Sequence, residues 1–472
     1  MTLRVDDRNR RWWILGAVGG VLGLVVLDET VVGVALPTIR RDLGMSSVSS
    51  HWVVNAYLLA FTCLVAAGGK LGDLLDVRGV FSAGLAIFGL GSLASGFTES
   101  GAAIIAARGI QGIGAAIVFP TSLAMITQVF PPKERGLALG IQATIGTVFM
   151  SLGPLLGGVL THLASWRWIF WVNLPVVVAI GVVVWAAWMP TIRTAGHTRF
   201  DISGLITLLL ALGGLVLGVM QGNEWGWVSL PTLGLLAGGA VMTAIFTVVE
   251  FRAAAPLIEV ALFRSGPFTA GNLMVLTAQY NKMAIFIFVA LYLQDALRMS
   301  ALHAGSALLF AVLPTPFTSL AGGRLTDRVG PRWVSLAGLL LNASALLWIG
   351  LAVPLRRLDM LIAPLLLWGA TLPVLFVSAR HMVMNAVAQE KQGQASGINV
   401  TAQFLGGTIG MAVFGTLLVT TGSFEIVFLA AAGLSLPVLV IASLCTGALP
   451  NPRKDLADGS KEKPSVAEGG KL

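Results

Sequence analysis

The chain has 472 residues, of which 56% are hydrophobic and only 11% are charged. A soluble domain carries roughly 25% charged residues, so a water-soluble fold of this composition would lack the charges to cover its surface. The alternating hydrophobicity of membrane strands is absent, which argues against a β-barrel. Composition therefore indicates an all-α polytopic membrane protein.

The apolar residues fall into fourteen blocks separated by short polar breaks. Blocks of about 18 to 25 residues match the length at which a helix crosses a ~30 Å hydrocarbon core. Because backbone polar groups in lipid must be satisfied internally, each block predicts a membrane-spanning helix. The blocks lie at 12–36, 51–69, 79–98, 102–129, 136–160, 168–189, 202–221, 229–249, 267–293, 302–322, 333–353, 358–379, 396–420 and 424–446.

The net charge of +8 is distributed unevenly over the loops between these blocks. With the N-terminus placed in the cytoplasm, 22 Lys and Arg residues fall on the cytoplasmic side, six on the outer side, and Arg108 and Lys282 inside blocks. Positive loops stay in the cytoplasm, so we expect a multi-pass protein of the inner membrane with both termini cytoplasmic. The basic surplus thus indicates a lipid bilayer as partner and not a nucleic acid.

An internal repeat relates two of the cytoplasmic loops. Residues 69–78 align with 323–332, sharing a glycine, a basic residue, a leucine, an aspartate and a final arginine. The repeat period exceeds six helices and their loops by ~75 residues, the length of blocks seven and eight. We predict an N-terminal six-helix bundle at 1–189, a two-helix insertion at 190–265, a C-terminal six-helix bundle at 266–446 and a disordered cytoplasmic tail at 447–472. Two parallel halves are typical of alternating access.

Further motifs occur at 27–37 in the first block, 108–115 in the fourth, 153–158 in the fifth and 166–175 before the sixth. Together with the 69–78 loop, they resemble the major facilitator superfamily, and within it the fourteen-helix drug:proton antiporters. The resemblance implies the fold of that superfamily, multidrug efflux or antibiotic resistance, and a proton gradient in place of a cofactor. We also expect a monomer. Three positions depart from the family pattern: Gly33 replaces the usual Asn, and Leu74 and Asp76 replace Arg and Gly.

Asp28 and Arg108 are the first candidates for proton coupling. An ionisable residue inside a span costs about 2.5 to 3.5 kcal/mol on insertion scales, so its presence suggests a function. Counting along the helices puts both side chains at a similar depth, where Arg108 would favour the ionised form of Asp28 when near it. The alternative is a fixed structural pair. Glu29 points ~100° away from Asp28 and is either a second titrating group or a residue facing an aqueous cleft.

Other polar and aromatic residues inside blocks are candidates for a substrate cavity. Lys282 could bind an anionic group, serve as counter-ion to an acid, or extend outward to the membrane surface, although it lies rather deep for that. Gln111 follows Arg108 by three residues and could steady the arginine. The candidates are Asn55, Tyr57, Gln111, Gln279, Tyr280, Asn281 and Lys282.

Two further groups of residues are assigned to conformational change. Gly153, Pro154, Gly157 and Gly158 give the fifth block a bend and a small-residue face; the resemblance associates them with export, and simple packing is the alternative. Ion pairs of the repeated loops are expected to form a cytoplasmic gate. Its residues are Gly69, Asp73, Arg78, Gly323, Asp327, Arg328, Gly330 and Arg332.

Motifs of enzymes and pumps are missing from the sequence. There is no phosphate-binding G-x-x-x-x-G-K-[ST] loop, no G-x-S-x-G nucleophile and no histidine spacing typical of a metal site. We therefore expect no enzyme, no metal site and no ATP-driven pump, but an exporter of drugs or other small amphipathic molecules in exchange for protons. The alternatives are a narrow-specificity metabolite or antibiotic exporter, an uptake symporter of the same fold, and a non-transporting sensor.

Overall fold

The computed structural model describes residues 9–131, 134–188, 201–254, 256–388 and 391–446. These residues contain fourteen helices long and apolar enough to cross a membrane, and none of them forms a strand. The prediction of an all-α protein with fourteen spans is thereby confirmed. The predicted tail at 447–472 lies outside the described residues.

The helices before the insertion are α1 (Arg10–Asp42), α2 (Ser47–Leu74), α3 (Val77–Phe97), α4 (Gly101–Val129), α5 (Arg135–Leu163), the short α6 (Trp168–Trp171) and α7 (Asn173–Ala187). The inserted pair is α8 (Ile202–Trp225) and α9 (Leu230–Arg252), followed by the 3₁₀ turn η1 (Val260–Arg264). The remaining elements are α10 (Gly266–Met283), η2 (Ala284–Val289), η3 (Tyr292–Ala296), α11 (Ala301–Val312), α12 (Thr315–Val329), α13 (Pro331–Ala352), η4 (Val353–Leu355), α14 (Asp359–Asn385), α15 (Gln392–Thr421) and α16 (Phe424–Cys445).

Several helices are longer than their apolar blocks. α1 has 33 residues and runs from Arg10 to Asp42, although its predicted block is 12–36. α14 continues six residues beyond the predicted end at 379. Hydropathy marks only the part of a helix inside the hydrocarbon core, whereas backbone hydrogen bonds extend the helix into the polar interface.

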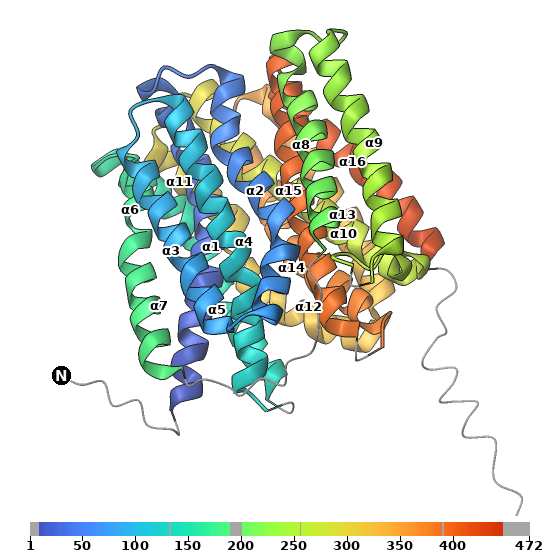
Figure 1. Ribbon diagram of the computed structural model, residues 1–472. Coiled ribbons are helices and arrows are strands. Elements are labelled where there is room, and N and C mark those ends of the chain that lie inside the picture. Colours follow the sequence, from blue (N-terminus) through green and yellow to red (C-terminus); the bar gives the residue numbers. More distant parts are fainter. Residues whose placement is uncertain (1–8, 132–133, 189–200, 255, 389–390, 447–472) are drawn as a thin grey trace, which may run out of the picture.

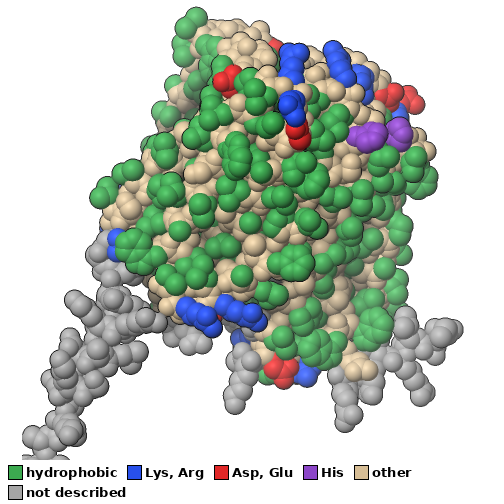
Figure 2. Space-filling view, turned by 180° about the vertical axis from the view of Figure 1, so that it is seen from behind, with side chains coloured by type: hydrophobic (Ala, Val, Ile, Leu, Met, Phe, Trp, Pro, Cys, Tyr) green, Lys and Arg blue, Asp and Glu red, His purple; other side chains and the backbone are tan. Residues whose placement is uncertain are grey.

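The helices pack as two groups, α1–α7 and α10–α16, with α8 and α9 standing together at one side (Figure 1). α8 contacts α2 of the first group and α15 of the second. Hydrophobic side chains cover a broad middle band of the surface, and charged side chains gather towards its two ends (Figure 2). We call these the α1–α2 end, where α1 meets α2, and the α2–α3 end, opposite to it.

The two groups of helices are joined at the α1–α2 end and in the middle of the bundle. Near the α1–α2 end, Arg40 and Asp295 form an ion pair of 3.0 Å, and Gln294 Nε2 donates to the Val34 carbonyl at 2.8 Å. In the middle, the hydroxyls of Thr62 and Thr408 lie 3.0 Å apart. The α1–α2 end is therefore closed in this conformation.

A close contact between α5 and α11 also holds the α1–α2 end together. A Cβ atom on Gly158 would lie 2.6 Å from the carbonyl oxygen of Ala301 and 3.0 Å from the Cα of Leu302. Only glycine permits this approach of two backbones. The small-residue face predicted for the fifth block thus lies at the junction of the two helix groups.

Gly158→Ala is expected to lower the melting temperature of the purified protein, because overpacking a close contact costs about 1 to 3 kcal/mol. Gly433→Ala is the matched control, since a Cβ at Gly433 of α16 meets no atom within 4 Å. That control should raise stability slightly through helix propensity. Equal melting temperatures for the two variants would contradict the contact.

Candidate functional site

Asp28 of α1 is bound by two side chains of α4. Arg108 Nη1 donates to Asp28 Oδ2 at 2.6 Å, and Gln111 Nε2 donates to Asp28 Oδ1 at 2.9 Å. Arg108 Nη1 also donates to Gln111 Oε1 at 2.6 Å. The three side chains form a closed triangle in which both oxygens of the carboxylate are engaged.

Arg108 is held from a second direction by α2. Its Nε donates to the Val53 carbonyl at 2.9 Å, and its guanidinium lies 4.5 Å from the ring centre of Tyr57. Asp28 and Arg108 are fully buried. A buried ion pair is stable only when its remaining donors and acceptors form hydrogen bonds, and here α2 provides the acceptor for Arg108 Nε. All these groups belong to the first helix group, so a rigid rotation of that group leaves their distances unchanged.

Glu29 faces the second helix group instead. Its Oε2 lies 2.7 Å from Lys282 Nζ of α10, and Gln279 Nε2 of the same helix donates to its Oε1. Glu29 and Lys282 expose only 2% and 3% of their surface. Of the three roles considered for Lys282, the structure places it as the counter-ion of an acid. This ion pair joins the two helix groups deep inside the protein.

The backbone is irregular directly after Lys282. α10 ends at Met283, and the chain continues as π-helical turns in η2 and η3. Such wide turns inside helices occur frequently at functional sites. A Cβ at Gly33 would collide with the Phe286 carbonyl of η2. The departure from the family's Asn at Gly33 is therefore explained, because α1 and η2 approach too closely for a side chain.

A chain of hydrogen bonds leads from Glu29 to Arg380, which is not among the site residues predicted from the sequence. Gln403 Nε2 of α15 donates to Gln279 Oε1 at 3.3 Å, and Arg380 Nη2 of α14 donates to Gln403 Oε1 at 2.5 Å. Arg380 follows the predicted block 358–379 by one residue, so the block boundaries alone place it in a loop. The structure places it inside α14. An arginine that directly follows an apolar block is the sequence signal that would have identified it.

Asn281 takes part in a neutral polar cluster of the second helix group. Its Nδ2 donates to Asn342 Oδ1 at 3.1 Å and to Ser435 Oγ at 3.0 Å. Asn342 Nδ2 in turn donates to Thr371 Oγ1 at 3.3 Å. α13, α14 and α16 supply these partners, so the Asn281 side chain lies among the helices of its own group.

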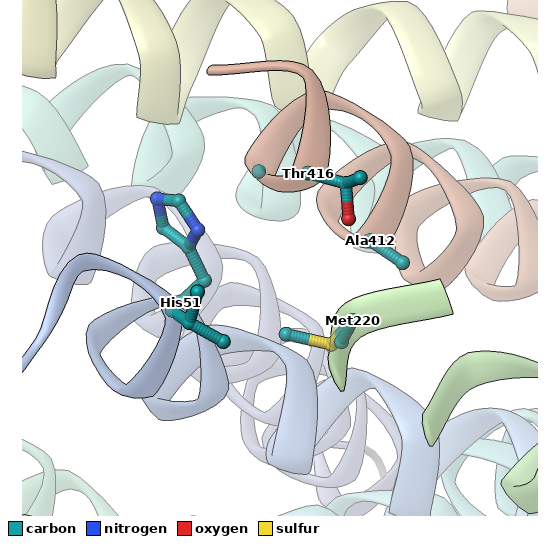
Figure 3. Close-up of a pocket in the computed structure, with 6 residues that line it drawn as sticks. His51, Met220, Ala412 and Thr416 are labelled. Atoms are coloured by element: carbon teal, nitrogen blue, oxygen red, sulfur yellow. The ribbon is translucent and has the colours of Figure 1, made fainter. Parts of the chain in front are cut away.

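Two further cavity candidates, Asn55 and Tyr280, contact different neighbours. Asn55 Nδ2 donates to Met220 Sδ of α8 at 2.7 Å, and the rings of Tyr280 and Phe414 lie 4.3 Å apart. A small pocket opens where α2, α8 and α15 meet, and the His51 ring points into it (Figure 3). Its lining residues are Val48, His51, Met220, Ala412, Gly415 and Thr416.

The predicted gate residues lie at the α2–α3 end. Arg78 Nη2 donates to the Trp185 carbonyl at 3.2 Å, and the Arg332 guanidinium lies 4.8 Å from the Trp333 ring centre. Asp327 and Arg328 are exposed in the last turn of α12, between Gly323 and the positive-φ Gly330. Gly69 and Asp73 lie near the end of α2, and the Asp73 side chain is outside the described part of the structure.

The departure at Asp76 has a local explanation. Asp76 Oδ2 accepts from the Gly79 backbone N–H at 2.8 Å, which caps the start of α3. Aspartate is a preferred N-cap, whereas glycine at this position would leave that N–H without a side-chain acceptor. Among the described residues, no group of three His, Cys, Asp or Glu side chains is placed to hold a metal ion.

Comparison with known proteins gives a consistent result. The family model of the Major Facilitator Superfamily matches residues 18–201 and 272–471. The chain is 33% identical over 423 residues to the tetracenomycin C resistance and export protein of Streptomyces glaucescens, covering 87% of this chain and 76% of that protein. It is 37% identical over 411 residues to the cephamycin export protein CmcT of Amycolatopsis lactamdurans, covering 85% and 83%. It is 35% identical over 427 residues to the puromycin resistance protein of Streptomyces alboniger, covering 88% and 82%.

Asp28→Asn is expected to lower the melting temperature strongly, because removing one partner of a buried ion pair costs about 3 to 5 kcal/mol. The double variant Asp28→Asn/Arg108→Gln should recover part of that loss, since no charge then stays unpaired. Asp359→Asn is the control: its partner Arg357 lies 2.5 Å away in an exposed pair, which contributes less than about 1 kcal/mol. A double variant as unstable as the sum of its single variants would contradict the pairing.

Proposed function

Since this chain belongs to the Major Facilitator Superfamily and is a membrane transporter, we propose that it exports drugs or other small amphipathic molecules in exchange for protons. The names of three relatives support export, because they describe resistance to, or export of, tetracenomycin C, cephamycin and puromycin. Each of these names refers to one antibiotic or antibiotic class. They therefore also favour a second candidate, a narrow-specificity antibiotic exporter with the same mechanism.

The observation that carries the proposal is the pairing of two consecutive buried carboxylates of α1 with cations of different helix groups. Alternating access requires the groups to separate at the α1–α2 end. Separation would leave Glu29 without Lys282, and an unpaired carboxylate in the membrane interior is costly. Proton binding to Glu29 removes that charge, so protonation favours opening of the α1–α2 end.

Asp28 is the second proton-binding group of this proposal. In the described conformation, Arg108 and Gln111 donate hydrogen bonds to both of its oxygens. Water that enters an opened α1–α2 end competes for these hydrogen bonds and brings the proton to Asp28. Arg108 keeps its own place through Val53 and Tyr57. Arg108 therefore serves as a fixed charge next to a carboxylate of variable protonation.

The side of the membrane at which each step takes place follows from the orientation predicted by the charged loops. We propose that the protein lies in the inner membrane, with its α2–α3 end and both termini on the cytoplasmic side. In that orientation the conformation described here is closed towards the outside. Cargo would be taken up from the cytoplasmic side, where Glu29 would also bind its proton, and a proton from the outside would bind to Asp28 after the conformational change. Glu29 would return its proton to the cytoplasmic side when its pair with Lys282 forms again.

Ethidium efflux from energised whole cells tests the proposal. Wild-type efflux should fall by about tenfold or more on addition of a protonophore, and Asp28→Asn should lose the gradient-dependent part to a similar extent. Asp359→Asn should transport normally, since its exposed pair lies at the start of α14. Dye movement in wild type that responds neither to the protonophore nor to Asp28→Asn would replace antiport by facilitated diffusion.

A further inference from the structure

The side chain of Arg380 is accessible, and none of the described residues serves as its counter-ion. The residue is exposed, although it lies inside α14, five residues before the helix ends at Asn385. That distance corresponds to ~8 Å along the helix. Within the described residues, no carboxylate lies within 4 Å of its guanidinium. A cation at such a position favours an anion, whether from a ligand or from a lipid.

The guanidinium points towards α15 and the other helix group. Its Nη2 donates to Gln403 Oε1, Gln403 donates to Gln279, and Gln279 donates to Glu29 of α1. A side chain that extends to the membrane surface would direct its charge away from the neighbouring helices. The hydrogen-bond chain instead places Arg380 on the side of the second helix group that faces the first.

The surroundings of Arg380 suit an organic acid with an apolar body. Phe376 lies one turn earlier on α14, is half-buried, and has its ring centre 5.7 Å from the Arg380 guanidinium. A guanidinium offers a planar fork of donors that matches the two oxygens of a carboxylate. The adjacent ring supplies apolar surface, and the Gln403 amide supplies a further polar group.

We propose that Arg380 binds the acidic group of the cargo while Phe376 packs against its apolar body, and that the preferred cargo is an amphipathic molecule with a free carboxylate. This inference rests on the proposed export function. A carboxylate on Arg380 would compete with the Gln403 amide oxygen for the guanidinium. Because Gln403 is connected through Gln279 to Glu29, cargo binding would also change the surroundings of the ion pair that joins the helix groups.

The test uses two dyes that differ only at the acidic group, rhodamine B with its free carboxylate and the ethyl ester of the same dye. Binding is measured on the purified full-length protein in nanodiscs of phosphatidylcholine, which offers no net anionic headgroup. Arg380→Gln should weaken binding of the acid by about tenfold or more and leave the ester within about twofold. Arg380→Lys, which keeps the charge but not the planar fork of donors, should restore only part of the affinity for the acid.

Arg252→Gln is the matched control, because Arg252 is exposed at the end of α9 and loses the same charge at the same end of the bundle. It should leave both affinities unchanged. Unchanged binding of the ester to Arg380→Gln also shows that this variant is folded. Equal loss for both dyes, or no loss for either, would overturn the proposal.

Efflux of the same two dyes from cells separates this inference from the proposed function. Preferential export of the acid, lost in Arg380→Gln, supports both. Export of the ester by wild type and Arg380→Gln alike, without preference for the acid, keeps the exporter and overturns the role of Arg380. Binding of the acid that depends on Arg380, combined with no export of either dye, keeps the site and overturns the export function.

Discussion

Charges inside a membrane must be paired, and α1 places two carboxylates on consecutive residues where this constraint is strongest. The helical turn directs Asp28 to α4 of its own helix group and Glu29 to α10 of the other. Close packing keeps both directions fixed: Gly153 of α5 lies against Thr30, and Gly33 lies against Phe286. One turn of α1 thus forms two ion pairs. The pair of Asp28 and Arg108 lies within the first helix group, and the pair of Glu29 and Lys282 joins the two groups.

The two helix groups are unequal in their buried polar chemistry. The first holds the charged triangle of Asp28, Arg108 and Gln111, whereas the cluster around Asn281 and Asn342 in the second is neutral. A neutral cluster keeps its hydrogen bonds whatever the protonation state of its surroundings. The second group therefore offers a constant frame, to which Lys282 adds one positive charge at the junction. Proton-dependent behaviour is concentrated in α1 and its partners.

The sequence was sufficient to predict the fourteen spans and to select Asp28 and Arg108 as a pair at similar depth, because hydropathy and helical rise are local properties. It was not sufficient to assign Lys282 to Glu29. These residues are separated by 253 positions, and the relation between two helix groups leaves no periodic signal in either of them. Arg380 was missed for a different reason: the apolar block ends before the helix does, so a residue of the helix was taken for a loop residue. The roles assigned to these residues are still predictions.

The central claim is that the pair of Glu29 and Lys282 holds the α1–α2 end closed until Glu29 is protonated. Spin labels at Ser47 of α2 and His303 of α11, in a background without Cys63 and Cys445, report the separation of the helix groups at that end by pulsed electron paramagnetic resonance. Glu29→Gln imitates the protonated residue and should shift the distance distribution at neutral pH towards the longer distances that wild type adopts only on acidification. A distribution that stays short and unchanged, both in Glu29→Gln and in acidified wild type, would contradict the claim.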